Sequence, residues 1–161
     1  MVVATIVVSV LGALSTGTSK KQQRKRYLRK YKQAPWAPPA AAFGPAWTVN
    51  NFFLLLALRQ LLEDNTLNHR ERLLVRQAMI WTIFFSFGYV YFRKGSPVLA
   101  AVWTLADFAL AVSSYYLATK SGKGLSTKYL PLLGWTGYAG TVAVYQALRN
   151  PDPVLETPAI Q

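Results

Sequence analysis

The chain has 161 residues, 52% of them hydrophobic, and a formal net charge of +12. It has no cysteine and a single histidine, His69, which excludes disulfide bonds and leaves very few ligands for a zinc or haem site. A soluble nucleic-acid-binding protein spreads its basic residues over exposed faces. This chain gathers them between long uncharged stretches, so we expect no nucleic-acid partner.

The first predicted helix covers residues 2–18 and is short for a membrane span. A cleaved signal peptide is the alternative, because small residues near Gly17 imitate a cleavage site. A signal peptide, however, carries its positive charges before the apolar stretch, and here only Met1 precedes it. We therefore expect a short spanning helix.

The segment 19–42 combines a basic cluster with a proline-rich end. Such a cluster marks the cytoplasmic side of a membrane protein, and it can also rest on anionic lipid headgroups. Pro35, Pro38 and Pro39 make the end of the segment stiff and extended. A stiff loop beside Trp36 predicts a lid over an apolar pocket, and an interfacial tryptophan anchor is the alternative. The basic cluster consists of Lys20, Lys21, Arg24, Lys25, Arg26, Arg29, Lys30 and Lys32.

Four further apolar stretches, at residues 43–62, 73–92, 97–118 and 129–148, are each long enough to cross a bilayer. Together with the first helix they predict an all-α integral membrane bundle of five transmembrane helices without a β-sheet. This single domain would cover residues 1–150. The proline-containing segment 151–161 is expected to be an irregular, exposed tail.

The distribution of basic residues also predicts an orientation. The basic cluster follows the first helix, and Arg93 and Lys94 follow the third. The loops after the second and fourth helices carry fewer, mixed charges, with Lys120, Lys123 and Lys128 as the main exception. The positive-inside rule then places the N-terminus outside and the C-terminus in the cytoplasm. A cysteine-free chain without a transit peptide fits a multi-pass protein of a bacterial cell membrane.

Three polar residues are expected at membrane depth: Asn50, Asn51 and Asp107. Polar groups there are costly unless they face a cavity or one another. Arg76 and Gln77 are further candidate partners for Asp107. A functional role and a purely structural one are equally open for this carboxyl group.

The stretch from Trp36 to Val49 reads W-x-P-P-x-x-x-F-G-P-x-W-T-V. It resembles the signature of the translocator protein and tryptophan-rich sensory protein family (TspO/MBR). Ala106-Asp107-Phe108 and the segment 131–135 resemble elements of the family's fourth and fifth helices, so the resemblance covers roughly residues 2–150. Asn50-Asn51 stand where the family usually has Leu-Tyr, and this difference bears on which ligands the chain would accept.

The resemblance implies an apolar cavity between the helices that accepts porphyrins and other flat ligands. Trp135, Ala139 and Val142 share one helical face, whereas Gly137 and Gly140 favour close helix packing. The ligand-binding residues expected on these grounds are Trp36, Pro39, Phe43, Trp47, Asn50, Asn51, Trp81, Trp103, Asp107, Trp135, Ala139 and Val142.

Val142, Tyr145 and Arg149 match a proposed sterol pattern that is weak. Tyr145 stands one residue later after Trp135 than in the animal relatives, which turns it by about 100° around the helix. We infer no sterol binding from this pattern.

The resemblance implies a membrane receptor or sensor for tetrapyrroles, with protoporphyrin IX or a haem-related ring as ligand and no required cofactor. One alternative is porphyrin degradation in light and oxygen through Trp47 and Trp135, and another is a small-molecule transporter that uses Asp107. The sequence offers no acid–base pair or metal site for conventional catalysis, which favours a receptor over an enzyme. Five helices without an inverted repeat argue against a transporter. A homodimer through small residues of the fourth or fifth helix is one of the expected states.

Overall fold

The computed structural model describes residues 1–15, 19, 21, 25 and 31–160. The predicted end of the first helix at residues 16–18, and most of the basic cluster, lie outside the described residues. Within the described part the chain forms helices and turns without a strand, and an isolated bridge joins Asp152 to Thr157. The prediction of an all-α bundle is confirmed. Its long helices are α1 (Val2–Ser15), α3 (Phe43–Glu63), α4 (Arg70–Gly88), α5 (Pro97–Ser121) and α6 (Leu130–Arg149).

Three shorter helical elements lie next to the long helices. The 3₁₀ turn η2 (Ala40–Ala42) leads into α3, and the 3₁₀ turn η4 (Ser126–Tyr129) leads into α6. The π-helix η3 (Tyr89–Lys94) continues α4 without a break. α4 begins at Arg70 rather than at residue 73, because a polar first turn belongs to the helix although its residues are not apolar.

The helices have the lengths that a membrane bundle requires. Among the described residues, three segments are long and apolar enough to span a bilayer: Ala40–Glu63, Arg70–Lys94 and Pro97–Ser121. α6 has 20 residues, which is sufficient length, but its glycines and threonines make it less apolar. α1 has 14 residues and is about 21 Å long at 1.5 Å per residue, which is shorter than the ~30 Å hydrocarbon layer. The chain is therefore an integral membrane bundle of five helices with a short first one.

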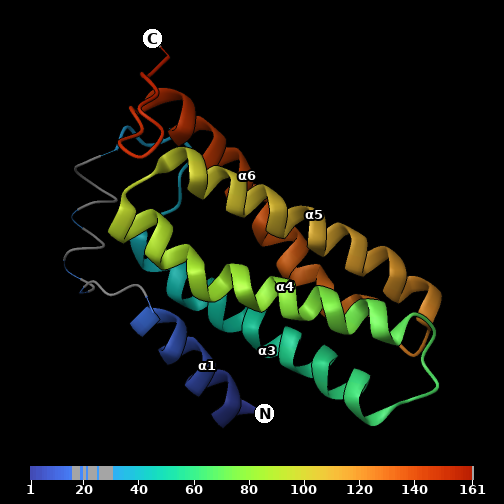
Figure 1. Ribbon diagram of the computed structural model, residues 1–161. Coiled ribbons are helices and arrows are strands. Elements are labelled where there is room, and N and C mark those ends of the chain that lie inside the picture. The colour runs from blue at the N-terminus through green and yellow to red at the C-terminus, as the bar shows by residue number, and fades with distance from the viewer. Residues whose placement is uncertain (16–18, 20, 22–24, 26–30, 161) are drawn as a thin grey trace.

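Figure 1 shows α1 lying beside α3, while α5 packs against both α4 and α6. The most extensive contact joins α5 and α6. The C-terminus and the segment before α3 lie at one end of the bundle, and the α3–α4 and α5–α6 loops lie at the other. The polar connections therefore gather at two ends, as expected for helices that cross a membrane.

The tightly packed core fills the half of the bundle near the α3–α4 and α5–α6 loops. Its largest buried side chain is Tyr129, whose hydroxyl accepts a hydrogen bond from Gln77 Nε2 at 3.2 Å. The same amide nitrogen donates to the Leu54 carbonyl at 3.2 Å. The other half, around Phe43, is left for the site described below. Aliphatic members of the core are Leu54, Leu61, Leu73, Ile80, Leu117, Leu125 and Leu132.

Glycines allow close helix contacts at two places. A Cβ atom on Gly137 would lie 3.0 Å from Cε2 of Phe108, and one on Gly140 would lie 3.4 Å from Leu105. The prediction of close helix packing is confirmed for Gly137, whereas a Cβ atom on Gly140 would make an ordinary van der Waals contact. On α1, a Cβ atom at Gly12 would lie 2.4 Å from Cζ of Phe84, so this glycine lets the short helix approach α4.

The C-terminal tail is anchored to the bundle, which the expectation of an exposed end did not include. Asp152 is 2% exposed. Its Oδ2 accepts hydrogen bonds from Ser96 Oγ at 2.5 Å and from the Val98 amide at 2.9 Å, at the start of α5. Its Oδ1 accepts from the amides of Val154 and Leu155 at 2.8 and 3.0 Å. This carboxylate therefore caps α5 and folds the tail at the same time.

The segment before the proline-rich stretch is held at the same end. Asn150 Oδ1 accepts the Lys32 amide at 2.7 Å, and its Nδ2 donates to the Lys32 carbonyl at 3.1 Å. Gln146 accepts a hydrogen bond from the Tyr91 hydroxyl at 2.9 Å and donates to Gln33 at 2.5 Å. These contacts join the described end of the first loop to α6 and η3.

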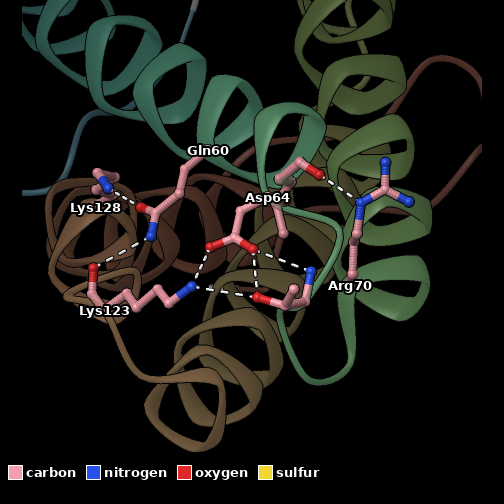
Figure 2. A network of polar contacts seen from close by, with 7 residues as sticks. Gln60, Asp64, Arg70, Lys123 and Lys128 are labelled. Atoms are coloured by element: carbon pink, nitrogen blue, oxygen red, sulfur yellow. Dashed lines mark hydrogen bonds and ion pairs between the residues drawn. The ribbon is translucent and has the colours of Figure 1, made fainter.

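At the opposite end, a polar network links α3 to the α5–α6 loop (Figure 2). The loop reverses through Gly122, Lys123 and Gly124, whose φ values of 74°, 52° and 66° are all left-handed. The Lys123 ammonium forms an ion pair with Asp64. The backbone carbonyl of Lys123 accepts a hydrogen bond from Gln60 Nε2 at 3.2 Å. Lys128 donates a further hydrogen bond to Gln60.

Acid should weaken this end of the bundle. Hydrogen bonds from Lys123 and then from Thr66 lower the pKa of Asp64 from 3.8 to about 2. A carboxyl group with a lowered folded-state pKa contributes stability above its unfolded pKa and loses it as pH falls through the folded one. We expect the contribution of Asp64 to be complete above about pH 4 and lost as pH falls toward about 2. The melting temperature measured in detergent should fall more steeply with decreasing pH across this range for the wild type than for Asp64→Asn.

Salt provides the control for this measurement. The Asp64–Lys123 pair is exposed, so added salt should screen it and reduce the difference between the wild type and Asp64→Asn. Equal slopes at low salt would show that the pair contributes nothing to stability.

Candidate functional site

A small, partly enclosed cavity of about 40 Å³ lies between α3, α4, α5 and α6. Half of its lining residues are aromatic, and its threonine and aspartate side chains come from α5 and α6. The lining residues are Phe43, Trp47, Ile83, Phe84, Phe87, Thr104, Asp107, Trp135, Thr136 and Ala139.

Five of the predicted ligand-binding residues meet at this cavity: Phe43, Trp47, Asp107, Trp135 and Ala139. They come from α3, α5 and α6, so the structure brings together positions that are almost a hundred residues apart in the sequence. Trp135 and Ala139 are one helical turn apart on α6 and face the same space, as their spacing predicts.

Five further lining residues, on α4, α5 and α6, were not predicted from the sequence. Phe84 and Phe87 are three residues apart on α4, and Thr104 is three residues before Asp107 on α5. This spacing places each pair on one helical face, which is the signal that would have identified them. The missed residues are Ile83, Phe84, Phe87, Thr104 and Thr136.

The aromatic rings pack against one another in an edge-on pair and a tilted pair. The centroids of Phe43 and Trp135 are 5.5 Å apart with ring planes at 84°, and those of Trp47 and Phe84 are 5.0 Å apart at 51°. Such pairs contribute about 0.5–1.5 kcal/mol each beyond the burial of their surface. Phe43 and Trp135 therefore touch each other in this arrangement and leave no flat gap between their rings.

The polar part of the wall consists of acceptor oxygens. Asp107 is 2% exposed, and its Oδ1 has no hydrogen-bond partner among the described residues. The hydroxyl of Thr104 donates to the Ala100 carbonyl at 2.9 Å, and that of Thr136 donates to the Leu132 carbonyl at 2.7 Å. Both threonines therefore have their hydroxyl protons engaged with their own helices.

None of the predicted partners of Asp107 reaches it. Arg76 donates to Ser113 Oγ at 3.0 Å and to the Arg72 carbonyl at 3.1 Å. Gln77 donates to groups of the packed core, as described above. Asn51 donates to Ser9 Oγ of α1 at 3.0 Å, and Asn50 is buried with its Nδ2 unpaired in the described structure.

The remaining predicted residues lie outside the cavity lining. Trp81 packs against Phe84 and Phe85, with its Nε1 buried and without a hydrogen-bond partner in the described part of the chain. Trp103 donates from Nε1 to Ser86 Oγ at 2.8 Å and so joins α5 to α4. The side chain of Val142 is buried but does not line the cavity.

The proline-rich lid docks on α6. Trp36 Nε1 donates to Thr141 Oγ1 at 3.1 Å, and the Tyr138 hydroxyl donates to the Trp36 carbonyl at 2.6 Å. The Trp36 ring meets Tyr145 edge-on, with centroids 5.4 Å apart. Tyr138, Thr141 and Tyr145 form one face of α6. Trp36 is 49% exposed, and Pro39 is exposed at the start of η2, so the lid covers α6 while Phe43 closes the cavity.

The residues of the sterol pattern serve two different contacts. Val142 is buried among the helices, whereas Tyr145 lies under Trp36. The Arg149 guanidinium lies over the Tyr145 ring at 5.9 Å from its centroid. Two members of the pattern therefore support the docked lid.

The model of the TspO/MBR family matches residues 1–148, from α1 to the last turn of α6. A search of individually curated proteins found no match to this chain.

Proposed function

The chain belongs to the TspO/MBR family, and from this membership we propose that it binds a tetrapyrrole such as protoporphyrin IX in the cavity between α3, α4, α5 and α6. Membership in the family supports a membrane protein of the sensor or receptor type. Binding would then change the state of the bundle rather than the chemistry of the ligand.

The aromatic wall is the observation that carries this proposal. Rings from three helices line one small cavity, and flat apolar ligands are held by such surfaces. These rings belong to Phe43, Trp47, Phe84, Phe87 and Trp135.

The size of the cavity sets a condition on binding. Its volume of about 40 Å³ is far below the ~300–1,000 Å³ typical of small-molecule sites. A tetrapyrrole therefore requires an opened state in which Phe43 and Trp135 separate and expose their ring faces. The docked lid, which precedes η2 and Phe43, lies where it can control that separation.

Replacing Ala139 with leucine should abolish the site by filling it. The added carbons exceed the free volume next to this residue, so we expect the dissociation constant for protoporphyrin IX to rise at least about tenfold. The measurement is quenching of tryptophan fluorescence in detergent, and this variant keeps all five tryptophans.

Ala143→Leu is the matched control, since it makes the same change one helical turn later, outside the cavity lining. It should bind like the wild type. Absence of saturable quenching by the wild type would refute the proposed function, and unchanged binding by Ala139→Leu would place the ligand elsewhere.

The same family membership and the apolar helices make the chain an integral membrane protein. We further propose that the C-terminus is cytoplasmic and the N-terminus outside, in a bacterial cell membrane. The described end of the basic loop, η3 with Arg93 and Lys94, and the C-terminal tail share one end of the bundle, which supports this orientation.

A further inference from the structure

Asp107 is a buried carboxyl group in the middle of the bundle. It lines the cavity, it is 2% exposed, and its Oδ1 accepts no hydrogen bond from the described residues. No lysine, arginine or histidine stands among the described lining residues, and neither ion pair of the described structure involves Asp107. A carboxylate at membrane depth is costly unless a positive charge accompanies it. The site is therefore suited to a cation that comes from outside the chain.

The rest of the wall adds two kinds of group that attract a cation. The hydroxyl groups of Thr104 and Thr136 donate to backbone carbonyls of their own helices, which leaves their oxygen lone pairs to accept. Five aromatic rings line the same cavity, and ring faces attract cations. A carboxyl group, acceptor hydroxyls and aromatic rings together suit an ammonium group, whose N–H donors match the oxygens and whose charge matches the rings.

The size of the cavity and its ligands limit which cation it takes. Its volume of about 40 Å³ exceeds the ~10–15 Å³ that one water molecule needs, so an ion of similar size fits and a large organic cation does not. Hard metal cations such as Mg²⁺ and Ca²⁺ take about six or more oxygen ligands. The described wall offers oxygens from three side chains, which favours an ammonium ion over a metal ion.

We propose that this cavity binds a small monovalent ammonium cation, of the size of ammonium or methylammonium, with Asp107 as its counter-charge. The N–H groups of the cation donate to Asp107 and to the threonine hydroxyls, and a methyl group packs against the rings. This site goes beyond tetrapyrrole binding and does not depend on it.

Thermal unfolding of the full chain in detergent tests the site with methylammonium chloride as the probe. A ligand that binds only the folded state should raise the melting temperature by about 3–6 °C at tenfold excess over its dissociation constant. The reference is tetraethylammonium chloride, whose cation is far larger than the cavity. Exchanging one chloride salt for the other at constant ionic strength keeps general screening equal. Sodium chloride should give a smaller rise, because sodium relies on oxygen ligands.

Asp107→Asn keeps the size of the side chain and an acceptor oxygen but removes the negative charge. This variant should lose the rise in melting temperature. Ser114→Ala is the matched control, since Ser114 is buried two turns further along α5, its Oγ is also unpaired in the described structure, and it does not line the cavity. It should keep the rise. Helical circular dichroism checks that both variants are folded.

Tryptophan fluorescence gives a second measurement that does not depend on unfolding. Trp47 and Trp135 line the cavity, so methylammonium should shift the emission maximum of the wild type and of Ser114→Ala saturably. It should leave the emission of Asp107→Asn unchanged.

Three results would overturn the proposal. Equal melting temperatures in all three salts would show that the cavity holds water only. A rise in sodium chloride as large as that in methylammonium chloride would assign the site to its oxygen ligands alone. A rise that persists in Asp107→Asn would place the cation elsewhere. None of these results bears on tetrapyrrole binding, which the quenching titration with protoporphyrin IX measures separately.

Discussion

Replacing Asp152 with alanine should destabilise the bundle by about 2–4 kcal/mol, because one buried carboxylate satisfies Ser96 and three backbone amides. Without it, the Val98 amide in the first turn of α5 loses its partner, and the tail loses the acceptor around which it turns. Burial would raise the pKa of Asp152, but hydrogen bonds from Ser96 and the amides of Leu155, Val98 and Val154 lower it overall. The group is therefore ionised at neutral pH. Thermal unfolding in detergent measures the loss.

Asp152→Asn separates the contribution of the hydrogen bonds within the tail from that of the hydrogen bonds to the start of α5. The amide oxygen can accept from the tail amides of Val154 and Leu155, while the NH₂ group cannot accept from Ser96 or Val98. We expect an intermediate loss of stability. A wild-type melting temperature for Asp152→Ala would show that the tail contributes nothing to the fold.

Introducing leucine at Gly137 should separate α5 from α6. A Cβ atom alone would already lie 3.0 Å from the Phe108 ring, so the rest of the side chain has no room. Overpacking of this kind costs about 1–3 kcal/mol and can cost more where the neighbour cannot move. The α5–α6 contact also positions Trp135 and Thr136 against Asp107, so porphyrin binding should weaken together with stability. Thermal unfolding and the quenching titration measure the two effects.

Gly134 offers a matched control one turn away on the same helix. A Cβ atom there meets nothing within 4 Å, so Gly134→Ala should be tolerated and should gain up to about 1 kcal/mol from helix propensity. Gly137→Ala should lack this gain because its methyl group meets Phe108. Equal stability of the two alanine variants would show that α5 and α6 are not held at the distance seen here.

The charged residues at the two ends of the bundle lie in different environments. At the tail, Asp152 is enclosed by hydrogen-bond donors from two segments of the chain. At the other end, the side chain of Lys123 is 58% exposed and that of Asp64 is 24% exposed, so salt screens their pairing. Loss of Asp152 should therefore affect stability more than loss of Asp64.

Much of the fold could be predicted from the sequence, because a helix that crosses a bilayer needs only a sufficiently long apolar stretch. The starts of α3 and α5 follow from such stretches with prolines in or beside their first turns, and both agree with the structure. The spacing of Trp135 and Ala139 likewise predicted that both face one space. These are local properties of a helix, and local patterns determine them.

Tertiary structure alone decided which groups meet across the bundle. Asp152 pairs with Ser96 56 residues earlier, and nothing in the sequence of the tail indicates that contact. Phe43 closes the cavity against Trp135, while Trp36, predicted for the same wall, docks on the outside of α6. Oδ1 of Asp107 has no hydrogen-bond partner among the described residues, although several polar residues were candidates to bind it. The physical reason is that rotation and register between helices follow from the packing of all side chains together, whereas apolar length and spacing are set within each helix.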